Sequence, residues 1–312
     1  MNKKVGIVIV TYNRLALLKE GLDSLRNQTY PNRQIIVVNN GSSDGTLEWL
    51  NKQKDVITLT QPNSGGAGGF FTGMRYVAEH GFDYCWVMDD DVVCEPDALQ
   101  ELIHAYAQKV NMGFVCSKVI GIDGHPMNTP VVDDRATLNG CADYTDLISE
   151  FMIKVKEATF VSVLCGVDVI RKVGLPYKEF FIWGDDTEYT MRISQQYECY
   201  MACKSVVVHK RTIQRELNFE TETDPFRRKM YFYLKRNAAF IDFKYNKLYK
   251  SRVFRLRFYL RQYKYYLSLL LHGHYSLAEI VLKSTCALWF FNPIVQYPNT
   301  EGKSHLNNEL NY

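Results

Sequence analysis

Short apolar runs alternate with amphipathic stretches along the first hundred residues. The apolar runs are rich in β-branched residues and predict strands at 5–10, 34–38, 56–59 and 83–88. Apolar residues at helical spacing predict helices at 15–25, 47–51, 66–80 and 96–109, the first with Asn13 as its N-cap. This alternation is typical of an α/β fold, with a mainly parallel sheet and right-handed crossovers.

The pattern is less regular between residues 110 and 210. Apolar runs at 113–120, 159–164 and 206–208 predict three more strands, with helices after residue 165 and over 185–197. Residues 121–156 mix Pro, Asp and Asn without a clear period. This stretch is either a surface insertion or a lid over an acceptor, and the sequence does not decide between them.

Aromatic and basic residues dominate beyond residue 224. Helices are predicted at 226–237 and 249–271, and Asp242 is the single acid between Arg227 and Lys264. We therefore divide the chain into an α/β domain at 1–223 and a C-terminal helical region at 224–312. Basic residues interleaved with Phe and Tyr suit contact with an anionic membrane surface. Single-stranded nucleic acid, or simple packing on the α/β domain, are the alternatives.

The composition is that of a folded protein: 46% of the 312 residues are hydrophobic and 23% are charged, with a net charge of +3. Eight cysteines lack CxxC pairs and zinc-like spacing, which favours a reducing compartment. The N-terminus shows no signal-peptide pattern, and no apolar run reaches the roughly 18 residues of a membrane span. We expect a cytoplasmic protein that contacts the inner face of the plasma membrane. The oligomeric state stays open, a homo-oligomer included.

Three consecutive carboxylates, Asp89, Asp90 and Asp91, follow the fourth predicted strand. Open α/β sheets bind ligands at the carboxyl ends of their strands. Adjacent like charges there need a cation or hydrogen-bond donors to compensate them. Mg²⁺ or Mn²⁺ would do so, and such ions also bridge to substrate phosphates. The alternative is an acidic loop that caps the helix after Pro96.

Polar loops follow the first three predicted strands as well. They span 11–14, 39–46 and the Gly-rich 61–69, and in a parallel sheet they share one edge with the three carboxylates. Gly-rich turns at helix starts suit close approach of a phosphate or sugar to backbone N–H groups. Turn chemistry explains any single loop equally well, but four loops at one edge favour a ligand-binding crevice.

A second acidic motif, Trp-Gly-Asp-Asp-Thr-Glu at 183–188, opens the helix predicted over 185–197. Asp185 as N-cap with Glu188 three residues later would form a capping box. That arrangement explains neither Asp186 nor the Trp-Gly pair. His209 directly follows the strand at 206–208, where a lone histidine is more often a hydrogen-bonded structural residue than a metal ligand.

Several of these motifs together carry a resemblance. Val-Thr-Tyr-Asn-Arg at 10–14, Asn-Gly-Ser-Ser-Asp-Gly-Thr at 40–46 and Met-Asp-Asp-Asp at 88–91 resemble the nucleotide-sugar half of family 2 inverting glycosyltransferases, which have the Rossmann-like GT-A fold. The likeness runs from residue 5 to about residue 100, and 63–70 is most similar to the galactofuranosyltransferases. More typical members have Ala-Arg-Asn at 69–71, where this chain has Gly-Phe-Phe. Many members also have an acidic residue at the position of Asn40, which pairs with the base of the nucleotide.

The resemblance implies a metal-dependent inverting hexosyltransferase of cell-surface polysaccharide synthesis. Its donor would be UDP-galactofuranose and its acceptor a saccharide or lipid-linked glycan. Asp186 would be the catalytic base with Asp185 beside it, and Trp183, Gly184 and Glu188 would contact the acceptor. The implied donor contacts are Thr11, Asn13, Arg14, Asn40, Asp44, Asn63, Gly65, Gly66, Asp89 and Asp90. Mn²⁺ or Mg²⁺ would bind Asp89, Asp91 and His209.

Other functions fit parts of the same pattern. The same residues could use dTDP-rhamnose or UDP-galactose as the donor. A nucleotide-sugar-binding module without turnover belongs to a different class, and it would have no need of a catalytic base at 186. A nucleic-acid partner is not expected, because binding through the basic region would leave the first 210 residues unexplained.

Overall fold

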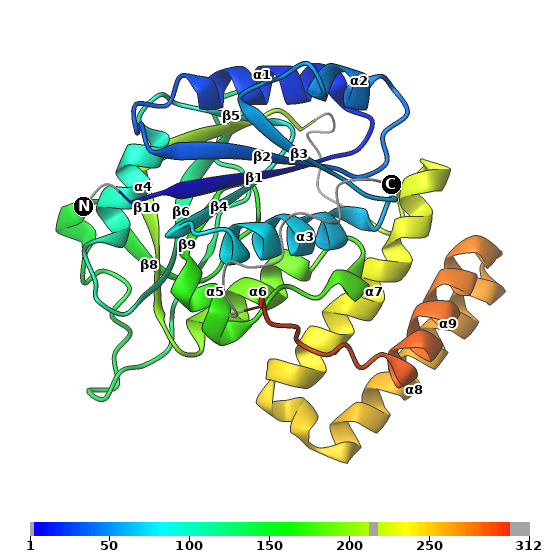
Figure 1. Cartoon of the computed structure of the whole chain (residues 1–312). Helices are drawn as coiled ribbons and strands as arrows, with labels where there is room; N and C mark the ends of the chain where they lie inside the picture. The colour runs from blue at the N-terminus through cyan, green and yellow to red at the C-terminus, as the bar shows by residue number, and fades with distance from the viewer. Residues whose placement is uncertain (1–2, 212–217, 300–312) are drawn as a thin grey trace.

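The computed structural model describes residues 3–211 and 218–299, in which ten strands form a single sheet (Figure 1). The sheet order is β3-β2-β1-β4-β9-β6-β10-β8-β7, and β5 also pairs with β10. The strands are β1 Val5–Thr11, β2 Arg33–Asn39, β3 Val56–Thr60, β4 Tyr84–Asp89, β5 Val92–Cys94, β6 Met112–Gly121, β7 Val131–Val132, β8 Met152–Glu157, β9 Val163–Gly166 and β10 Glu198–His209.

Helices cover both faces of this sheet, and the last three helices of the described chain lie together beside it (Figure 1). They are α1 Leu15–Arg26, α2 Thr46–Leu50, α3 Gly65–Glu79, α4 Ala98–Tyr106, α5 Val167–Val173, α6 Asp185–Ser194, α7 Pro225–Tyr245, α8 Arg252–Leu271 and α9 Tyr275–Phe290, with 3₁₀ turns at Ile148–Glu150, Lys178–Phe180 and Lys247–Lys250. No described helix is long and apolar enough to cross a membrane.

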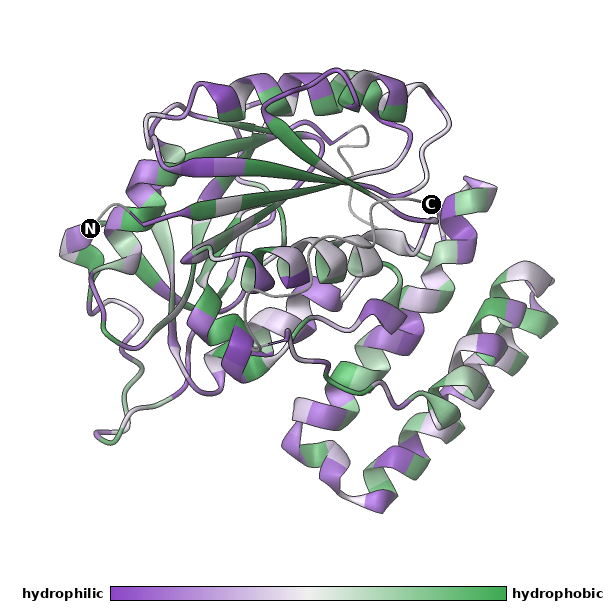
Figure 2. Ribbon diagram, viewed as in Figure 1, coloured by the Kyte–Doolittle hydropathy of each residue, from purple (hydrophilic) through white to green (hydrophobic). Residues whose placement is uncertain are grey.

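The central strands are hydrophobic on both faces because helices bury each side (Figure 2). Ile7 and Ile9 of β1 pack in one core with α1, α2 and α4, whereas Val8 packs in a second core with α3, α5 and α6. Strands β3, β2, β1 and β4 run parallel. The polar loops that follow them therefore emerge at one edge of the sheet.

The predicted α/β class, with helices on both faces of the sheet and a C-terminal helical region, is confirmed. Strand β9 lies between β4 and β6 and runs antiparallel to both of them, so β4 and β6 point in the same direction. The stretch 121–156 contains β7 and most of β8, which pairs with β10, and α9 is a further helix that the sequence pattern did not predict. Several predicted boundaries also differ: β9 lies at Val163–Gly166, α6 ends at Ser194, β10 begins at Glu198 and α7 continues to Tyr245.

The start of α1 corrects a predicted cap. Arg14, not Asn13, is the N-cap residue, and its side chain makes no capping hydrogen bond. Asp44 supplies the missing acceptor from another loop, because its Oδ2 accepts a hydrogen bond from Leu15 N at 3.1 Å. Asn13 has φ +54°, and its Oδ1 accepts from Ser43 N at 2.7 Å. The first two polar loops are thus tied to each other.

A line of glycines brings α3 close to the sheet. A Cβ at Gly69 would lie 2.3 Å from Val10 Cγ1, and one at Gly73 would lie 2.3 Å from Val8 Cγ1. These glycines are four residues apart and so lie on the same face of α3. The next position along this face, Gly65, has φ +73° and would place a Cβ 1.9 Å from the Phe181 carbonyl oxygen. Helix α3 therefore touches both β1 and the segment that precedes α6.

Gly69→Ala is expected to lower the free energy of unfolding by about 1–3 kcal/mol, because the new methyl group meets Val10 in a close-packed core. The matched control is Gly66→Ala, where a Cβ has no neighbour within 4 Å. That change should be neutral or stabilise by up to about 1 kcal/mol. Chemical denaturation of both variants measures the difference, and equal midpoints would contradict the close approach of α3.

Candidate active site

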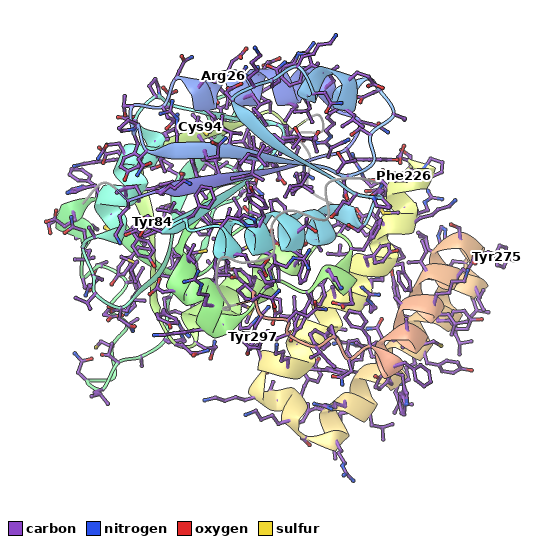
Figure 3. The ribbon with its side chains drawn as sticks, in the orientation of Figure 1. Arg26, Tyr84, Cys94, Phe226, Tyr275 and Tyr297 are labelled. Carbon is purple, nitrogen blue, oxygen red and sulfur yellow. The ribbon has the colours of Figure 1, made fainter. Side chains whose placement is uncertain are left out.

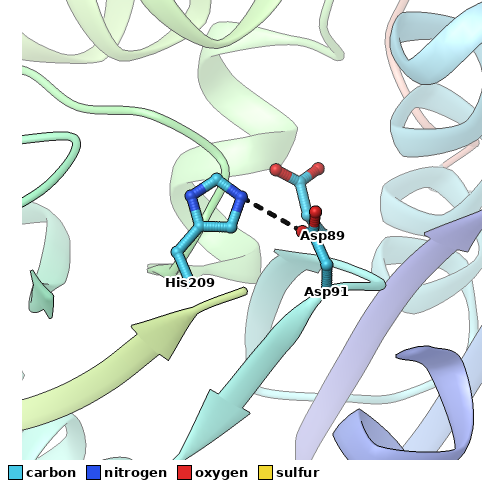
Figure 4. A group of neighbouring side chains, drawn as sticks. All are labelled: Asp89, Asp91 and His209. Atoms are coloured by element: carbon cyan, nitrogen blue, oxygen red, sulfur yellow. Dashed lines mark ion pairs between the residues drawn. The ribbon is translucent and has the colours of Figure 1, made fainter. Parts of the chain in front are cut away.

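Asp89, Asp91 and His209 meet at the carboxyl edge of the sheet (Figure 4). Asp89 ends β4, Asp91 lies in the turn that leads to β5, and His209 ends β10. Strand β5 pairs antiparallel with β10 and sets Val92 opposite His209, which brings the histidine to the acids. One ligand atom from each of the three residues lies within 4.8 Å of the other two.

His209 is held between two groups. Its Nε2 lies 3.1 Å from Asp91 Oδ1, and its Nδ1 lies 2.9 Å from Asn128 Oδ1. An amide oxygen only accepts, so Nδ1 carries a proton and Nε2 faces the acids. Asn128 has φ +47° and lies in the stretch without periodicity, where no sequence signal pointed to it. It is the residue of this group that sequence reasoning missed.

Asp90 connects the first loop to the acidic turn. It is buried, and its Oδ2 accepts a hydrogen bond from Thr11 Oγ1 at 2.7 Å. Arg14 NH1 lies 3.3 Å from Asp90 Oδ1 and 2.9 Å from Asp91 Oδ2. One half-exposed guanidinium therefore offsets two buried carboxylates. Three of the predicted donor residues, Thr11, Arg14 and Asp90, stabilise the turn in this way.

The other predicted donor residues lie in loops at the same edge. Asn40 Nδ2 donates to the Gly65 carbonyl at 2.9 Å, and Asn63 Oδ1 accepts from Gly65 N at 2.9 Å. Asp44 is exposed, and its Oδ1 accepts from Thr46 Oγ1 at 2.5 Å. These side chains shape the loops through local hydrogen bonds. Gly66 is partly exposed, and a Cβ there would have no neighbour within 4 Å.

The second acidic motif begins α6, but not through a capping box. The N-cap is Gly184 with φ +89°, and Asp185 is already the first residue of the helix. Glu188 is fully buried, and three groups lie 2.7 Å from its carboxylate: Arg192 NH2, Lys244 Nζ and Tyr245 OH. This burial leaves no surface for an acceptor, so the structure contradicts both predictions for Glu188. Instead, it joins α6 to α7.

Asp185 and Asp186 form a closely coupled pair in the first turn of α6. Burial raises the pKa of Asp185 to about 8, and the neighbouring Asp186 charge adds to this rise. Burial also raises the pKa of Asp186, although hydrogen bonds from backbone N–H groups oppose the shift. Asp186 is partly exposed and accepts from Thr187 N at 2.7 Å. It is thus an accessible carboxylate with an enhanced affinity for a proton.

The segment before the second acidic motif contacts the Gly-rich start of α3. Ala67 N, at the start of α3, donates to the Phe181 carbonyl at 3.1 Å. Trp183, two residues further on, is partly exposed, and its ring centroid lies 5.4 Å from that of Tyr231. The predicted donor side and the predicted acceptor side are therefore in direct contact.

Comparison with known proteins identifies the family that the first half of the chain matches. Residues 6–158 match the family model described as glycosyl transferase family 2. These residues form a family 2 glycosyltransferase domain. The family match ends before Asp185, Asp186 and His209, so it does not test their predicted roles.

Two named relatives resemble parts of the chain, one of them over a longer stretch than the family model. The galactofuranosyltransferase GlfT1 of Mycobacterium tuberculosis is 27% identical over 202 residues, covering 62% of this chain and 65% of the relative. The poly-β-1,6-N-acetyl-D-glucosamine synthase of Staphylococcus aureus is 25% identical over 115 residues, covering 36% of this chain and 27% of the synthase. The chain therefore spans less than two thirds of the length of these relatives.

A solved structure shares the fold. It is that of S. aureus TarS residues 1–349 in complex with UDP, with a TM-score of 0.54 and 14% identity, covering 77% of this chain and 65% of that 1–349 chain. The likeness supports the GT-A fold for the family 2 domain and the strands that follow it.

The charges at the edge of the family 2 domain suit a divalent cation. Burial raises the pKa of Asp89 to about 8, with a further rise from Asp91, and raises the pKa of Asp90 to about 6 despite Arg14. Burial would also raise the pKa of Asp91, but His209 and Arg14 outweigh it and hold that pKa below its ordinary value. Asp91 Oδ1 is buried and accepts no aligned hydrogen bond. Two carboxylates and one imidazole fit Mn²⁺ or Mg²⁺.

Mn²⁺ is expected to raise the thermal midpoint of the protein, by an amount equivalent to about 2.7 kcal/mol at a concentration 100 times its Kd. His209→Ala should abolish this shift, and Asn128→Ala should weaken Mn²⁺ binding about 10–100-fold because the imidazole loses its orienting partner. Thermal scans and calorimetry at several Mn²⁺ concentrations measure both effects.

A second acidic group provides the control for the Mn²⁺ titration. Asp143, Asp146 and Glu198 also lie together, but each of them already forms an ion pair with Lys109 or Lys154. Asp146→Asn should leave the Mn²⁺ response unchanged. If the Mn²⁺-induced rise of the thermal midpoint survives in His209→Ala but disappears in Asp146→Asn, Mn²⁺ binds at that second group instead.

Proposed function

We propose that this chain is an inverting glycosyltransferase that transfers galactofuranose from UDP-galactofuranose to a hydroxyl group of a saccharide or lipid-linked glycan. The observation that carries this proposal is the contact between the start of α3, which follows one of the polar loops at the edge of the sheet, and the segment that precedes Asp185 and Asp186. The carbonyl before Trp-Gly-Asp-Asp is hydrogen-bonded to the N-terminus of α3, beside the loops that follow the parallel strands. A binding module would need the donor loops but not an accessible carboxylate of raised pKa next to them.

The leaving group would be held at the edge of the sheet. Asp89, Asp91 and His209 would bind a divalent cation, which when present offsets the negative charge that develops on the departing nucleoside diphosphate. Asp90 and Arg14 keep this turn in place through their hydrogen bonds with Thr11 and Asp91. The backbone of Gly66 is open to a phosphate or sugar, since no atom would contact a Cβ at that position.

Asp186 would act on the acceptor. Its carboxylate takes the proton of the acceptor hydroxyl while the acceptor oxygen attacks the anomeric carbon from the face opposite the leaving diphosphate. One C–O bond forms and one breaks in the same displacement, so the configuration inverts without a covalent enzyme intermediate. Asp185 shares the charge of the pair and, being buried, is shielded from the acceptor. Trp183 would provide an apolar wall for the acceptor sugar.

The choice of donor rests on the named relatives. The galactofuranosyltransferase GlfT1 is among the most similar proteins, and the TarS structure contains UDP. Residues 69–71 add to this choice: Phe70 and Phe71 are buried, and Phe70 packs edge-on against Phe160 with ring centroids 4.8 Å apart. This part of α3 offers no polar side chain of the kind found in typical members. dTDP-rhamnose and UDP-galactose stay as alternative donors for the same machinery.

Asp186→Asn is expected to reduce transfer about 10²–10⁴-fold, because general-base catalysis contributes that much. UDP affinity should change less than about threefold, since Asp186 does not belong to the donor loops. Radiolabelled or coupled assays with UDP-galactofuranose, dTDP-rhamnose and UDP-galactose measure turnover, and calorimetry measures UDP binding. Near-normal turnover by Asp186→Asn would reject this base, and UDP binding without hydrolysis or transfer from any donor would favour the binding module.

We also propose that α8 and α9 rest on an anionic membrane. Many apolar side chains of these helices are exposed, and Tyr275 at the start of α9 projects outward with 69% exposure (Figure 3). The exposed apolar residues of α8 are Val253, Phe254, Leu256, Leu260, Tyr263, Leu267 and Leu271, and its basic residues are Arg252, Arg255, Arg257, Arg261 and Lys264. Helix α8 contains no acid that would repel an anionic surface.

A cavity between α7, α8 and α9 also supports the membrane proposal. It has a volume of about 550 Å³ and lies between the end of α7, the start of α8 and the end of α9. Its lining residues are Phe240, Phe243, Lys244, Arg252, Arg255, Leu256, Tyr259, Leu288, Trp289, Phe291 and Asn292, which include three cations and no acid. A lining that combines apolar and cationic side chains suits a lipid with a phosphate head group.

Arg257→Glu combined with Arg261→Glu should weaken binding to vesicles containing anionic phospholipid about 30-fold or more, since each basic residue near the surface contributes about 1 kcal/mol. Neutral phosphatidylcholine vesicles should bind poorly in every case. Lys52→Glu, an exposed site on the α/β side, is the matched control and should retain binding. Co-sedimentation measures the bound fraction. If oligonucleotides bind more tightly than the anionic vesicles, the nucleic-acid alternative is favoured instead.

A further inference from the structure

The segment that leads into α6 adopts backbone conformations that L-residues rarely take. Phe181 has φ +66° and ψ −61°, and Ile182 N donates to the Phe180 carbonyl at 2.8 Å, which closes a γ-turn of the uncommon hand. Trp183 follows with φ +62° and Gly184 with φ +89°. Three residues of positive φ thus lie within four positions, directly before Asp185. Such conformations persist only where surrounding contacts impose them.

Asn237 of α7 supplies those contacts. Its side chain is fully buried, and its Nδ2 donates to three carbonyl oxygens of the turn: Phe180 at 3.0 Å, Ile182 at 3.2 Å and Trp183 at 2.8 Å. This one amide nitrogen is therefore a hydrogen-bond donor for all three of these carbonyl groups. A Cβ at Gly184 would lie 3.4 Å from the Asn237 Cβ, so α7 packs closely against the turn at this position.

Arg236 fixes the orientation of the Asn237 amide. Its Nε and NH2 donate to Asn237 Oδ1 at 3.0 and 2.8 Å, which leaves the amide nitrogen facing the turn. The same guanidinium donates to the Glu179 carbonyl at 2.8 Å and lies 3.8 Å from the centre of the Phe291 ring. The carboxamide of Asn237 thus has both its oxygen and its nitrogen engaged, and it cannot rotate without losing hydrogen bonds.

Two further contacts hold the same segment. On the opposite side, the Phe181 carbonyl accepts from Ala67 N of α3 at 3.1 Å. One turn further along α6, Glu188 is bound by Lys244 and Tyr245 of α7. Helix α7 therefore fixes both the start of α6 and its second turn, with Asp185 and Asp186 between these points.

We propose that Asn237 is a positioning residue for Asp186: its amide holds the turn before α6 in the conformation that places the carboxylate toward the acceptor. This role rests on the function proposed above, in which Asp186 is the base. With this role of Asn237, α7 contributes to the candidate active site, although α7 lies in the region that the sequence pattern separates from the α/β domain. Asn237 itself is buried and touches no substrate.

Asn237→Ala and the near-isosteric Asn237→Asp both remove the donors to the turn. Each is expected to lower kcat at least about 30-fold while the acceptor KM and the UDP affinity stay within about threefold, because Asp186 is displaced but the donor loops are not. Hydrogen–deuterium exchange should accelerate in peptides covering 178–187 and stay unchanged in β1 and β4. General destabilisation would instead accelerate exchange throughout the sheet and lower UDP binding in parallel.

The matched control is Asn246→Ala at the end of the same helix. Asn246 Oδ1 accepts from Leu248 N at 3.0 Å, so its loss removes a cap without touching the turn. It should leave both kcat and exchange at 178–187 unchanged. Gly184→Ala is a second, independent variant, because a methyl group at φ +89° disturbs the turn without altering α7. It should reproduce the fall in kcat, and it tests the same idea if the Asn237 variants do not fold.

The outcomes separate this inference from the proposed function. Wild-type protein that transfers no sugar from any donor would reject the proposed function, whereas exchange at 178–187 would still report whether Asn237 holds the turn. An active wild type with unchanged kcat in folded Asn237→Ala and Gly184→Ala would overturn the positioning role. Unchanged exchange at 178–187 in Asn237→Ala would overturn it as well.

Discussion

Buried negative charge at the end of β4 is the constraint around which the neighbouring structure is arranged. Three carboxylates in a row repel one another, and burial raises the pKa of Asp89 and Asp90. The fold accommodates them with groups from separate elements: Thr11 at the end of β1 donates a hydrogen bond, Arg14 supplies a positive charge, and the His209 imidazole at the end of β10 lies 3.1 Å from Asp91. Each compensating group requires a particular strand pairing, so the acids and the topology of the sheet depend on each other.

The sequence predicted what depends on local pattern. Runs of β-branched residues identified the central strands, because a strand covered by helices on both faces must be apolar throughout. The acidic motifs were found because consecutive carboxylates at strand and helix ends are costly without a reason. Their functional assignments remain predictions, since the family 2 match ends at residue 158.

Features that depend on long-range contacts were missed. Asn128 acts through His209, and nothing in residues 121–156 signals that contact. Asp44 replaces Asn13 as the acceptor at the start of α1 because two loops meet there. Glu188 has the spacing of a capping box, but its carboxylate is taken by Lys244 of a helix that follows much later in the chain. The division at residue 223 is likewise a prediction from composition, and α7 makes some of its most buried contacts across that division.

The contact between Gly65 and Phe181 bears on how this protein could be redesigned. A side chain at position 65 has no space, because the Phe181 carbonyl oxygen lies where its Cβ would be, and the backbone there has positive φ. Mutant libraries aimed at a new sugar donor should therefore leave position 65 as glycine and vary Gly66 instead, where a side chain can project freely. The contact with Phe181 therefore makes position 65 unsuitable for diversification, whereas position 66 is available.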